Sequence, residues 1–204
     1  QVIKYAKMLN SKKLSALRSG NISIRYKNGF FITPSGKKYS SLKKSDIVFV
    51  KLDGTFNKKR GIPSSEWKFH QDIYINKKEA NAIVHAHSTN ATAVSTHKKS
   101  IPPFHYMIAM AGGSDIKCAK YATFGTRTLS KNILIALRNR KACLISNHGQ
   151  IAFEENISKA FELAEEVENI SLQYITSLKL GKPKILSLNE MKKVLSKAKN
   201  YKKG

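Results

Sequence analysis

Two histidines separated by a single residue could bind a divalent metal ion. His85 and His87 end an apolar stretch over residues 81–87, which we expect to form a β-strand. Side chains at positions i and i+2 of a strand point to the same face of the sheet, so the two imidazoles can converge on one ion. Two unrelated polar residues at a strand end have the same spacing, so the pattern alone leaves both interpretations open.

A third histidine, His148, follows a second apolar segment at a turn, and Gly149 beside it leaves room for a ligand. Three protein ligands with one open position are typical of a catalytic zinc site. Glu66, expected in the first turn of a helix, could be a ligand or a proton-transfer base. It equally suits a surface carboxylate that interacts with the helix dipole. His70, one helical turn later, could support the site from behind Glu66 or simply be a packed residue, and packing is the favoured interpretation.

Three short clusters of small polar residues could bind a phosphate group. Glycine lets backbone N–H groups approach an anion, and the start of a helix favours negative charge. Each cluster alone is also an ordinary turn. The clusters are Ser19-Gly20-Asn21, Thr33-Pro34-Ser35-Gly36 and Pro63-Ser64-Ser65.

The elements that must position these residues alternate between helical and strand-like patterns. We expect helices at 2–17, 64–76, 89–96, 131–140, 156–179 and 188–198. We expect strands at 22–26, 30–33, 46–52, 81–87 and 142–146, with a hairpin turn at Asn28-Gly29. The order predicts an α/β fold: a single domain over residues 1–204, with a central mixed, largely antiparallel sheet flanked by helices.

The chain is strongly basic, with 37 Lys and Arg against 13 Asp and Glu in 204 residues, a net charge of +24. Lysine dominates, and it occurs in pairs along the whole length rather than in one patch with aromatic residues. Proteins that bind nucleic acids favour arginine and cluster their positive charge in one surface patch. We therefore expect a lysine-rich surface and no nucleic-acid partner, although a positive field would help to steer a phosphorylated substrate.

Neither a membrane segment nor a disulfide is expected. No apolar run approaches the roughly 20 residues needed to span a bilayer, and the first residues do not resemble a signal peptide. Cys118 and Cys143 fit no metal-binding spacing. Free thiols in a cytoplasmic protein are therefore the expectation.

In order and spacing, these motifs resemble the class II aldolase/adducin family, over about residues 19–201. Four further segments, at 101–109, 111–113, 121–126 and 137–142, resemble members of this family that cleave L-fuculose 1-phosphate. The motifs that carry the resemblance are Ser19-Gly20-Asn21-Ile22-Ser23-Ile24-Arg25, Ile32-Thr33-Pro34-Ser35-Gly36, Pro63-Ser64-Ser65-Glu66-Trp67, His85-Ala86-His87 and Asn147-His148-Gly149.

The resemblance implies a metal-dependent cleavage of L-fuculose 1-phosphate to dihydroxyacetone phosphate and L-lactaldehyde. It implies one Zn²⁺ per subunit, bound by His85, His87 and His148. Glu66 would be a ligand in the resting state and would move a proton during turnover. The positions that match the family's phosphate-binding residues are Asn21, Ser35, Gly36, Ser64 and Ser65.

The resemblance also implies roles for two tyrosines and an assembly. Tyr106 matches a tyrosine near the aldehyde, and Tyr201 matches a C-terminal tyrosine that protonates or stabilises the product. The expected assembly is a C4 homotetramer with active sites at the subunit boundaries.

The chain departs from the family at Arg18, where a small residue such as threonine is usual; an arginine there could add a phosphate contact or block one. Three other functions use the same scaffold: phosphopentose 4-epimerase, sugar-phosphate dehydratase and a non-catalytic adducin-like interaction module. The His105-Tyr106-Met107 segment favours the aldolase over the other enzymes. The three histidines and Glu66 argue against a non-catalytic module.

Overall fold

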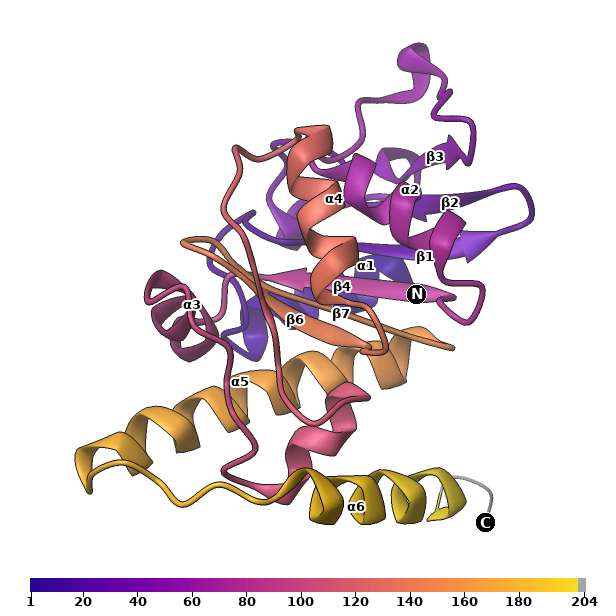
Figure 1. Cartoon of the computed structure of the whole chain (residues 1–204). Coiled ribbons are helices and arrows are strands. Elements are labelled where there is room, and N and C mark those ends of the chain that lie inside the picture. The colour runs from indigo at the N-terminus through magenta and orange to yellow at the C-terminus, as the bar shows by residue number, and fades with distance from the viewer. Residues whose placement is uncertain (202–204) are drawn as a thin grey trace.

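A mixed seven-stranded sheet forms the centre of the computed structural model, which describes residues 1–201 and the side chains of residues 1–198 (Figure 1). The strand order is β3-β2-β1-β4-β7-β6-β5. Every neighbouring pair is antiparallel except β5 and β6, so the predicted mixed, largely antiparallel sheet is confirmed. The strands are β1 (Asn21–Tyr26), β2 (Gly29–Ile32), β3 (Val48–Lys51), β4 (Ala82–Ala86), β5 (Cys118–Ala119), β6 (Ala142–Ile145) and β7 (Gly149–Glu154).

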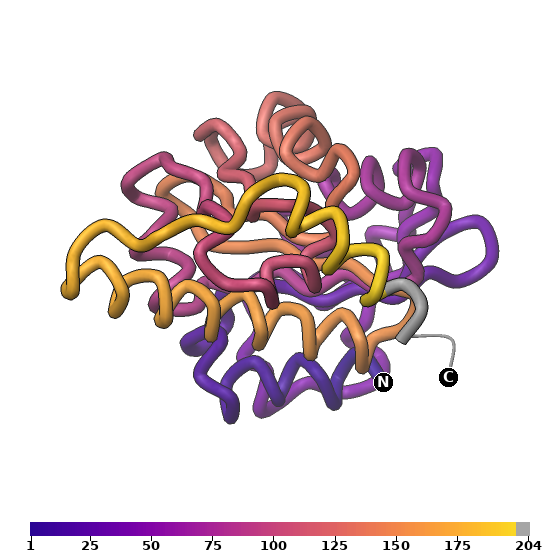
Figure 2. The backbone as a smooth tube through the Cα atoms, turned by 60° about the horizontal axis from the view of Figure 1, so that its bottom comes forward, coloured from indigo at the N-terminus to yellow at the C-terminus, as the bar shows by residue number. Residues whose placement is uncertain are grey.

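Helices cover both faces of the sheet, as predicted. In Figure 1, α2 and α4 lie above the sheet, whereas α5 and α6 lie below it. Figure 2 views the lower side, where η4 packs against both α5 and α6. The helices are α1 (Val2–Ser11), α2 (Trp67–Asn76), α3 (Thr89–Thr96), α4 (Arg127–Ala136), α5 (Ile157–Lys179) and α6 (Leu188–Tyr201), and the 3-10 turns are η1 (Tyr39–Ser41), η2 (Lys44–Asp46), η3 (Lys58–Arg60) and η4 (Tyr106–Ala111).

Strand β4 is buried on both faces, which explains its almost uninterrupted apolar sequence. Ala82, Val84 and Ala86 belong to the core between the sheet and helices α1, α3 and α5. Ile83 belongs to the second core, between the opposite face of the sheet and helices α2 and α4. The alternation therefore points His85 toward the α2 side, where its ring packs edge-on against Phe69 at a centroid distance of 5.3 Å.

None of the helices in the described part of the chain is long and apolar enough to cross a membrane.

The predicted helix over residues 2–17 was wrong in its second half. Helix α1 ends at Ser11. The backbone then turns twice through the left-handed region, at Lys13 (φ 57°) and Leu17 (φ 54°), and Leu17 is 75% exposed. The leucine spacing that suggested a continuing helix instead places Leu14 in the core at the turn.

The helix predicted at 131–140 is displaced toward the N-terminus. Helix α4 begins at Arg127, because the Thr126 hydroxyl caps it by accepting a hydrogen bond from the Leu129 N–H at 3.2 Å. Strands β5 and β7 were not predicted. All six residues of β7 are buried, including Gln150, and β5 has only two residues, so neither shows an alternating pattern.

A carboxylate on α5 caps the helix that follows the paired histidines. The side chain of Ser88, at the N-terminus of α3, makes no capping hydrogen bond. Glu168 takes this role: its carboxylate accepts hydrogen bonds from the Asn90 N–H at 2.8 Å, the Asn90 side-chain amide at 2.8 Å and the Ala91 N–H at 2.9 Å. This long-range cap anchors the chain just after β4.

Replacing Glu168 by glutamine is therefore expected to lower the free energy of unfolding by about 1–2 kcal/mol, because it removes the charge from a three-donor cap. Urea denaturation measures the change. Glu166→Gln on the same helix is the control, since Glu166 forms no hydrogen bond or ion pair with any described residue. Equal unfolding free energies for the two variants would refute the cap.

Candidate metal and phosphate site

Three chain segments meet at the C-terminal end of β4. This strand lies between β1 and β7, and His85 pairs with Asn21 on one side and with Ile151 on the other. His148 lies in the short turn between β6 and β7. A Cβ atom on Gly149 would lie 2.4 Å from the Ala86 carbonyl oxygen, so only glycine lets this turn approach β4 so closely.

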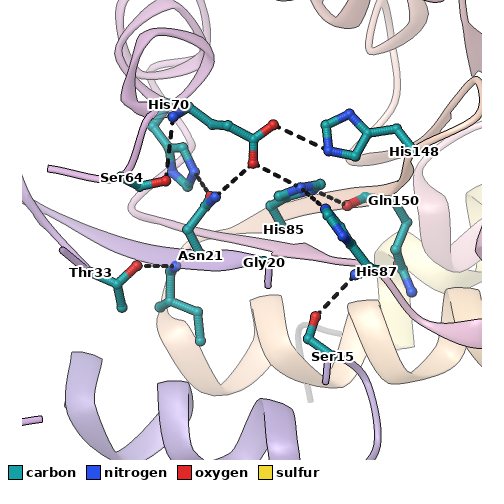
Figure 3. Close-up of polar contacts among 12 residues, drawn as sticks. Ser15, Gly20, Asn21, Thr33, Ser64, His70, His85, His87, His148 and Gln150 are labelled. Atoms are coloured by element: carbon teal, nitrogen blue, oxygen red, sulfur yellow. Dashed lines mark hydrogen bonds and ion pairs between the residues drawn. The ribbon is translucent and has the colours of Figure 1, made fainter. Parts of the chain in front are cut away.

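The structure brings the side chains of Glu66 and three histidines together. Their four donor atoms all lie within 4.8 Å of one another. The Nε2 atoms of His85 and His87 are 3.0 Å apart. Glu66 places Oε2 at 3.2 Å from His85 Nε2 and Oε1 at 3.2 Å from His148 Nε2. Figure 3 shows the three imidazole rings turned toward a common centre. Glu66 immediately precedes α2 rather than lying in its first turn.

The donor set fits a transition-metal cation. The Nδ1 atom of His85 lies 2.8 Å from the backbone oxygen of Gln150, to which it donates, so its Nε2 lone pair faces the cluster. Glu66 Oε1 is buried and makes no hydrogen bond with a described residue. Nitrogen ligands of a tetrahedral zinc ion lie about 3.4 Å apart, close to the spacing here. A cation satisfies these converging lone pairs and the buried carboxylate oxygen together.

The electrostatics of the cluster keep Glu66 and His87 in the forms that bind a cation. Burial raises the pKa of Glu66, but the charge of His85 and the close contacts with the imidazoles of His148 and His85 outweigh it and hold that pKa far below its usual range. Burial, followed by the charges of His85 and His148, lowers the pKa of His87 to about 3. Near neutral pH the carboxylate is therefore ionised and His87 is neutral.

A buried chain of hydrogen bonds supports Glu66 from behind. The Asn21 amide donates to Glu66 Oε2 at 3.0 Å, and Asn21 Oδ1 accepts from His70 Nε2. His70 Nδ1 then accepts from the Ser23 hydroxyl at 2.7 Å, which accepts from Tyr74 at 2.7 Å. His70 is fully buried, as predicted, but it also orients this amide. Its position one helical turn after Glu66 was the available signal.

Gly20 lets the segment before β1 pack closely against β4 at His85. Its φ of +76° lies in the left-handed region, and a Cβ atom there would lie 2.6 Å from the His85 carbonyl oxygen. Nearby, the His87 N–H donates to the Ser15 hydroxyl at 3.0 Å, and the Tyr39 hydroxyl donates to the Gly20 carbonyl. The close contact needs a residue without a side chain.

Three of the four metal-binding candidates, Glu66, His87 and His148, line a cleft of about 360 Å³, whereas His85 is fully buried behind them. All five predicted phosphate-binding residues line it. The residues along the cleft are Arg18, Ser19, Gly20, Asn21, Pro34, Ser35, Gly36, Ser64, Ser65, Glu66, His87, Tyr121, Ala122, Phe124, Asn147 and His148.

The two polar turns at the cleft are held side by side. Pro34 and Pro63 form an isolated antiparallel bridge, and the Ser64 N–H donates to the Thr33 carbonyl at 3.0 Å. Within the described residues, the N–H groups of Gly36 and Ser65 have no hydrogen-bond partner. Serine hydroxyls stand beside these free donors, so this end of the cleft can accept an anion.

One predicted site residue, Tyr106, does not line the cleft, and a second, Tyr201, lies where no side chain is described. Tyr106 begins η4, on the side of α5 and α6, and is 55% exposed. Tyr201 ends α6, and its side chain lies outside the described part of the structure. Sequence reasoning missed Tyr121 and Phe124 as lining residues, although the segment 121–126 was part of the resemblance. Loop residues show no periodicity from which a common orientation can be read.

Comparison with known proteins gives consistent matches. Residues 1–175 match the family described as Class II Aldolase and Adducin N-terminal domain. The chain is 50% identical to the L-fuculose phosphate aldolase of Escherichia coli (strain K12) over 185 residues, which cover 90% of this chain and 85% of the relative. It is 42% identical to the 5-methylthioribulose-1-phosphate/5-deoxyribulose-1-phosphate aldolase of Rhodospirillum rubrum, covering 98% of this chain and 90% of the relative.

The fold also matches a solved structure closely. An L-fuculose 1-phosphate aldolase structure superimposes with a TM-score of 0.93 at 38% identity, covering 97% of this chain and 94% of the other.

The contact at Gly20 predicts a costly substitution. Gly20→Ala combines a strained φ with a backbone clash, and it is expected to lower the free energy of unfolding by roughly 2–4 kcal/mol. Gly181→Ala is the matched control, since its φ is also positive (+116°) but no atom lies within 4 Å of the added Cβ. Urea denaturation of both variants measures the difference, and an equal loss would show that the His85 contact contributes nothing.

Proposed function

This chain belongs to the class II aldolase and adducin family, and on that premise we propose that it is a metal-dependent aldolase. Its substrate is L-fuculose 1-phosphate or a closely related ketose 1-phosphate, cleaved to dihydroxyacetone phosphate and an aldehyde, L-lactaldehyde for the first. One observation carries the proposal: a cluster of four potential metal ligands, three of which line the cleft, adjoins a set of unpaired phosphate donors in that same cleft. A non-catalytic interaction module needs neither.

A divalent cation, in our proposal one zinc ion per subunit, would be held by His85, His87, His148 and, at rest, Glu66. When bound, it would act as a Lewis acid that stabilises negative charge on the oxygens of the enediolate left by carbon–carbon cleavage. Neutral imidazoles suit this task because they leave the positive charge of the cation undiminished. His85 lies in β4, His87 directly follows it, and His148 approaches from the turn between β6 and β7.

Glu66 carries the proton in this mechanism. Its carboxylate is buried beside the histidines, and Asn21 fixes one of its oxygens by hydrogen bonding. In the synthetic direction the ionised carboxylate would remove a proton from the carbon of dihydroxyacetone phosphate, which leaves the enediolate. In the cleavage direction Glu66 would first take up the proton released by the substrate hydroxyl that becomes the aldehyde carbonyl, and it would then return that proton to the carbon of the enediolate. The hydrogen-bonded His70 keeps Asn21 in place.

The substrate phosphate binds at the other end of the cleft. Asn21, Ser35, Gly36, Ser64 and Ser65 supply N–H and O–H donors there. Anchoring the phosphate fixes the distance from the phosphate to the reacting carbons, which lowers the entropic cost of reaching the transition state.

The wider assignments follow from the family. We propose that residues 1–204 form one domain, that the enzyme is cytoplasmic with reduced cysteines, and that it assembles as a C4 homotetramer. Both cysteines are free in the structure. Tyr106 is exposed and away from its own cleft, which suits a role in a neighbouring subunit's site. Tyr201 would protonate or stabilise the product.

Two other reaction classes use the same scaffold, namely phosphopentose 4-epimerases and sugar-phosphate dehydratases. Among aldolases, the similarity to the Rhodospirillum rubrum enzyme makes 5-methylthioribulose 1-phosphate the second substrate to test. The purified protein should release dihydroxyacetone phosphate from L-fuculose 1-phosphate, measured by coupled reduction. Epimerised or dehydrated products without dihydroxyacetone phosphate would overturn the aldolase assignment.

In the same assay, Glu66→Gln is expected to lower turnover by roughly 10²–10⁴-fold, because glutamine cannot transfer a proton. The fold is expected to persist, since an amide of the same shape replaces the carboxylate; circular dichroism checks this. A near-normal rate in this variant would remove Glu66 from the mechanism.

Metal content tests the ligand assignment separately from catalysis. His87→Ala is expected to lose bound zinc, because it removes one of the three imidazoles. Elemental analysis of the purified proteins measures the ratio of zinc to protein. His97→Ala, at an exposed position after α3, is the matched control and should retain the metal. Full zinc occupancy in His87→Ala would contradict the assignment.

A further inference from the structure

We propose that Arg18 is a substrate-binding residue that recognises the phosphate group. The inference rests on the proposed function, because it names Arg18 as a residue that binds the phosphate group of the proposed substrate. Arg18 precedes β1 and lines the cleft three residues before Asn21. Its Nη1 donates to the Gly36 carbonyl at 2.9 Å. That contact places the guanidinium at the phosphate end of the cleft.

The charge of the cleft makes this position distinctive. The chain has a net charge of +24, yet Arg18 is the single lysine or arginine among the described residues that line the cleft. Glu66 is the single acidic residue there. Serine hydroxyls and backbone N–H groups supply hydrogen bonds to a phosphate but no net charge. Arg18 is therefore the one side chain of the lining that can balance a phosphate dianion.

The guanidinium has donors available for this role. It carries five N–H donors in a planar fork, and the structure commits one of its nitrogens to Gly36. The side chain is exposed and forms no ion pair with a described residue. A fork of this kind binds two phosphate oxygens at once, which lysine cannot do. Gly36 and Ser65, whose N–H groups have no partner among the described residues, line the same cleft.

A purely structural role is the competing explanation, because the contact with Gly36 also ties the segment before β1 to the phosphate turn. The variant Arg18→Gln distinguishes phosphate binding from this structural role. Glutamine keeps a donor for the Gly36 carbonyl but removes the positive charge, whereas Arg18→Met removes both. Arg60→Gln is the matched control, since Arg60 is an exposed arginine outside the cleft.

The experiment measures KM and kcat for the ketose 1-phosphate, the inhibition constant of inorganic phosphate, and the shift of the melting temperature by inorganic phosphate. Arg18→Gln and Arg18→Met are both expected to raise KM and the inhibition constant by about 10- to 100-fold, since a charge-assisted contact is lost. The change in kcat is expected to stay within about threefold, because the phosphate contact is the same in ground and transition states. Arg60→Gln should match the wild type.

The outcomes separate this inference from the proposed function. If the wild type cleaves the substrate and Arg18→Gln keeps its KM and phosphate inhibition, Arg18 is only a tether and the inference is wrong. If the wild type cleaves no ketose phosphate but phosphate raises its melting temperature in an Arg18-dependent way, the anion site stands and the reaction is wrong. If neither effect occurs in the wild type, both fail.

Discussion

A buried carboxylate surrounded by three converging imidazoles is the interaction on which this structure depends. Burying the charge of Glu66 and directing imidazole lone pairs at one point both cost free energy unless a cation joins them. The cluster lies at the end of the central strand of the sheet, β4. The neighbouring elements then follow from the need to bring Glu66 and His148 to His85.

The central position of β4 makes that convergence possible. A strand with neighbours on both sides can receive one residue from each. Strand β1 supplies Asn21, which holds Glu66, and the turn before β7 supplies His148. Helix α2 packs on the face to which His85 points, so Glu66 arrives at its beginning and His70 one turn later. An edge strand would have left one of these contacts to solvent.

Much of this could be predicted because it depends on local periodicity. The i, i+2 spacing of His85 and His87 needs only a strand, and the alternation of elements predicts the α/β sheet. The end of α1 could not be predicted, since Lys13 and Leu17 adopt positive φ for tertiary reasons. Strand β7 is buried throughout and shows no alternation. Tyr121 and Phe124 reach the cleft by a loop path that no periodicity describes.

The cleft divides recognition between its two ends by charge. At the metal end, neutral imidazoles leave the cation fully able to offset the negative charge that develops on the substrate. At the phosphate end, the charge is already present in the ground state, so neutral donors with one guanidinium suffice to hold it. Both ends are polar and directional, whereas Tyr121 and Phe124 add two exposed aromatic side chains to the lining of the cleft. In the proposed function the two polar ends therefore recognise the carbonyl and phosphate groups of the ketose phosphate, which leaves Tyr121 and Phe124 to contact the part of the substrate that becomes the aldehyde.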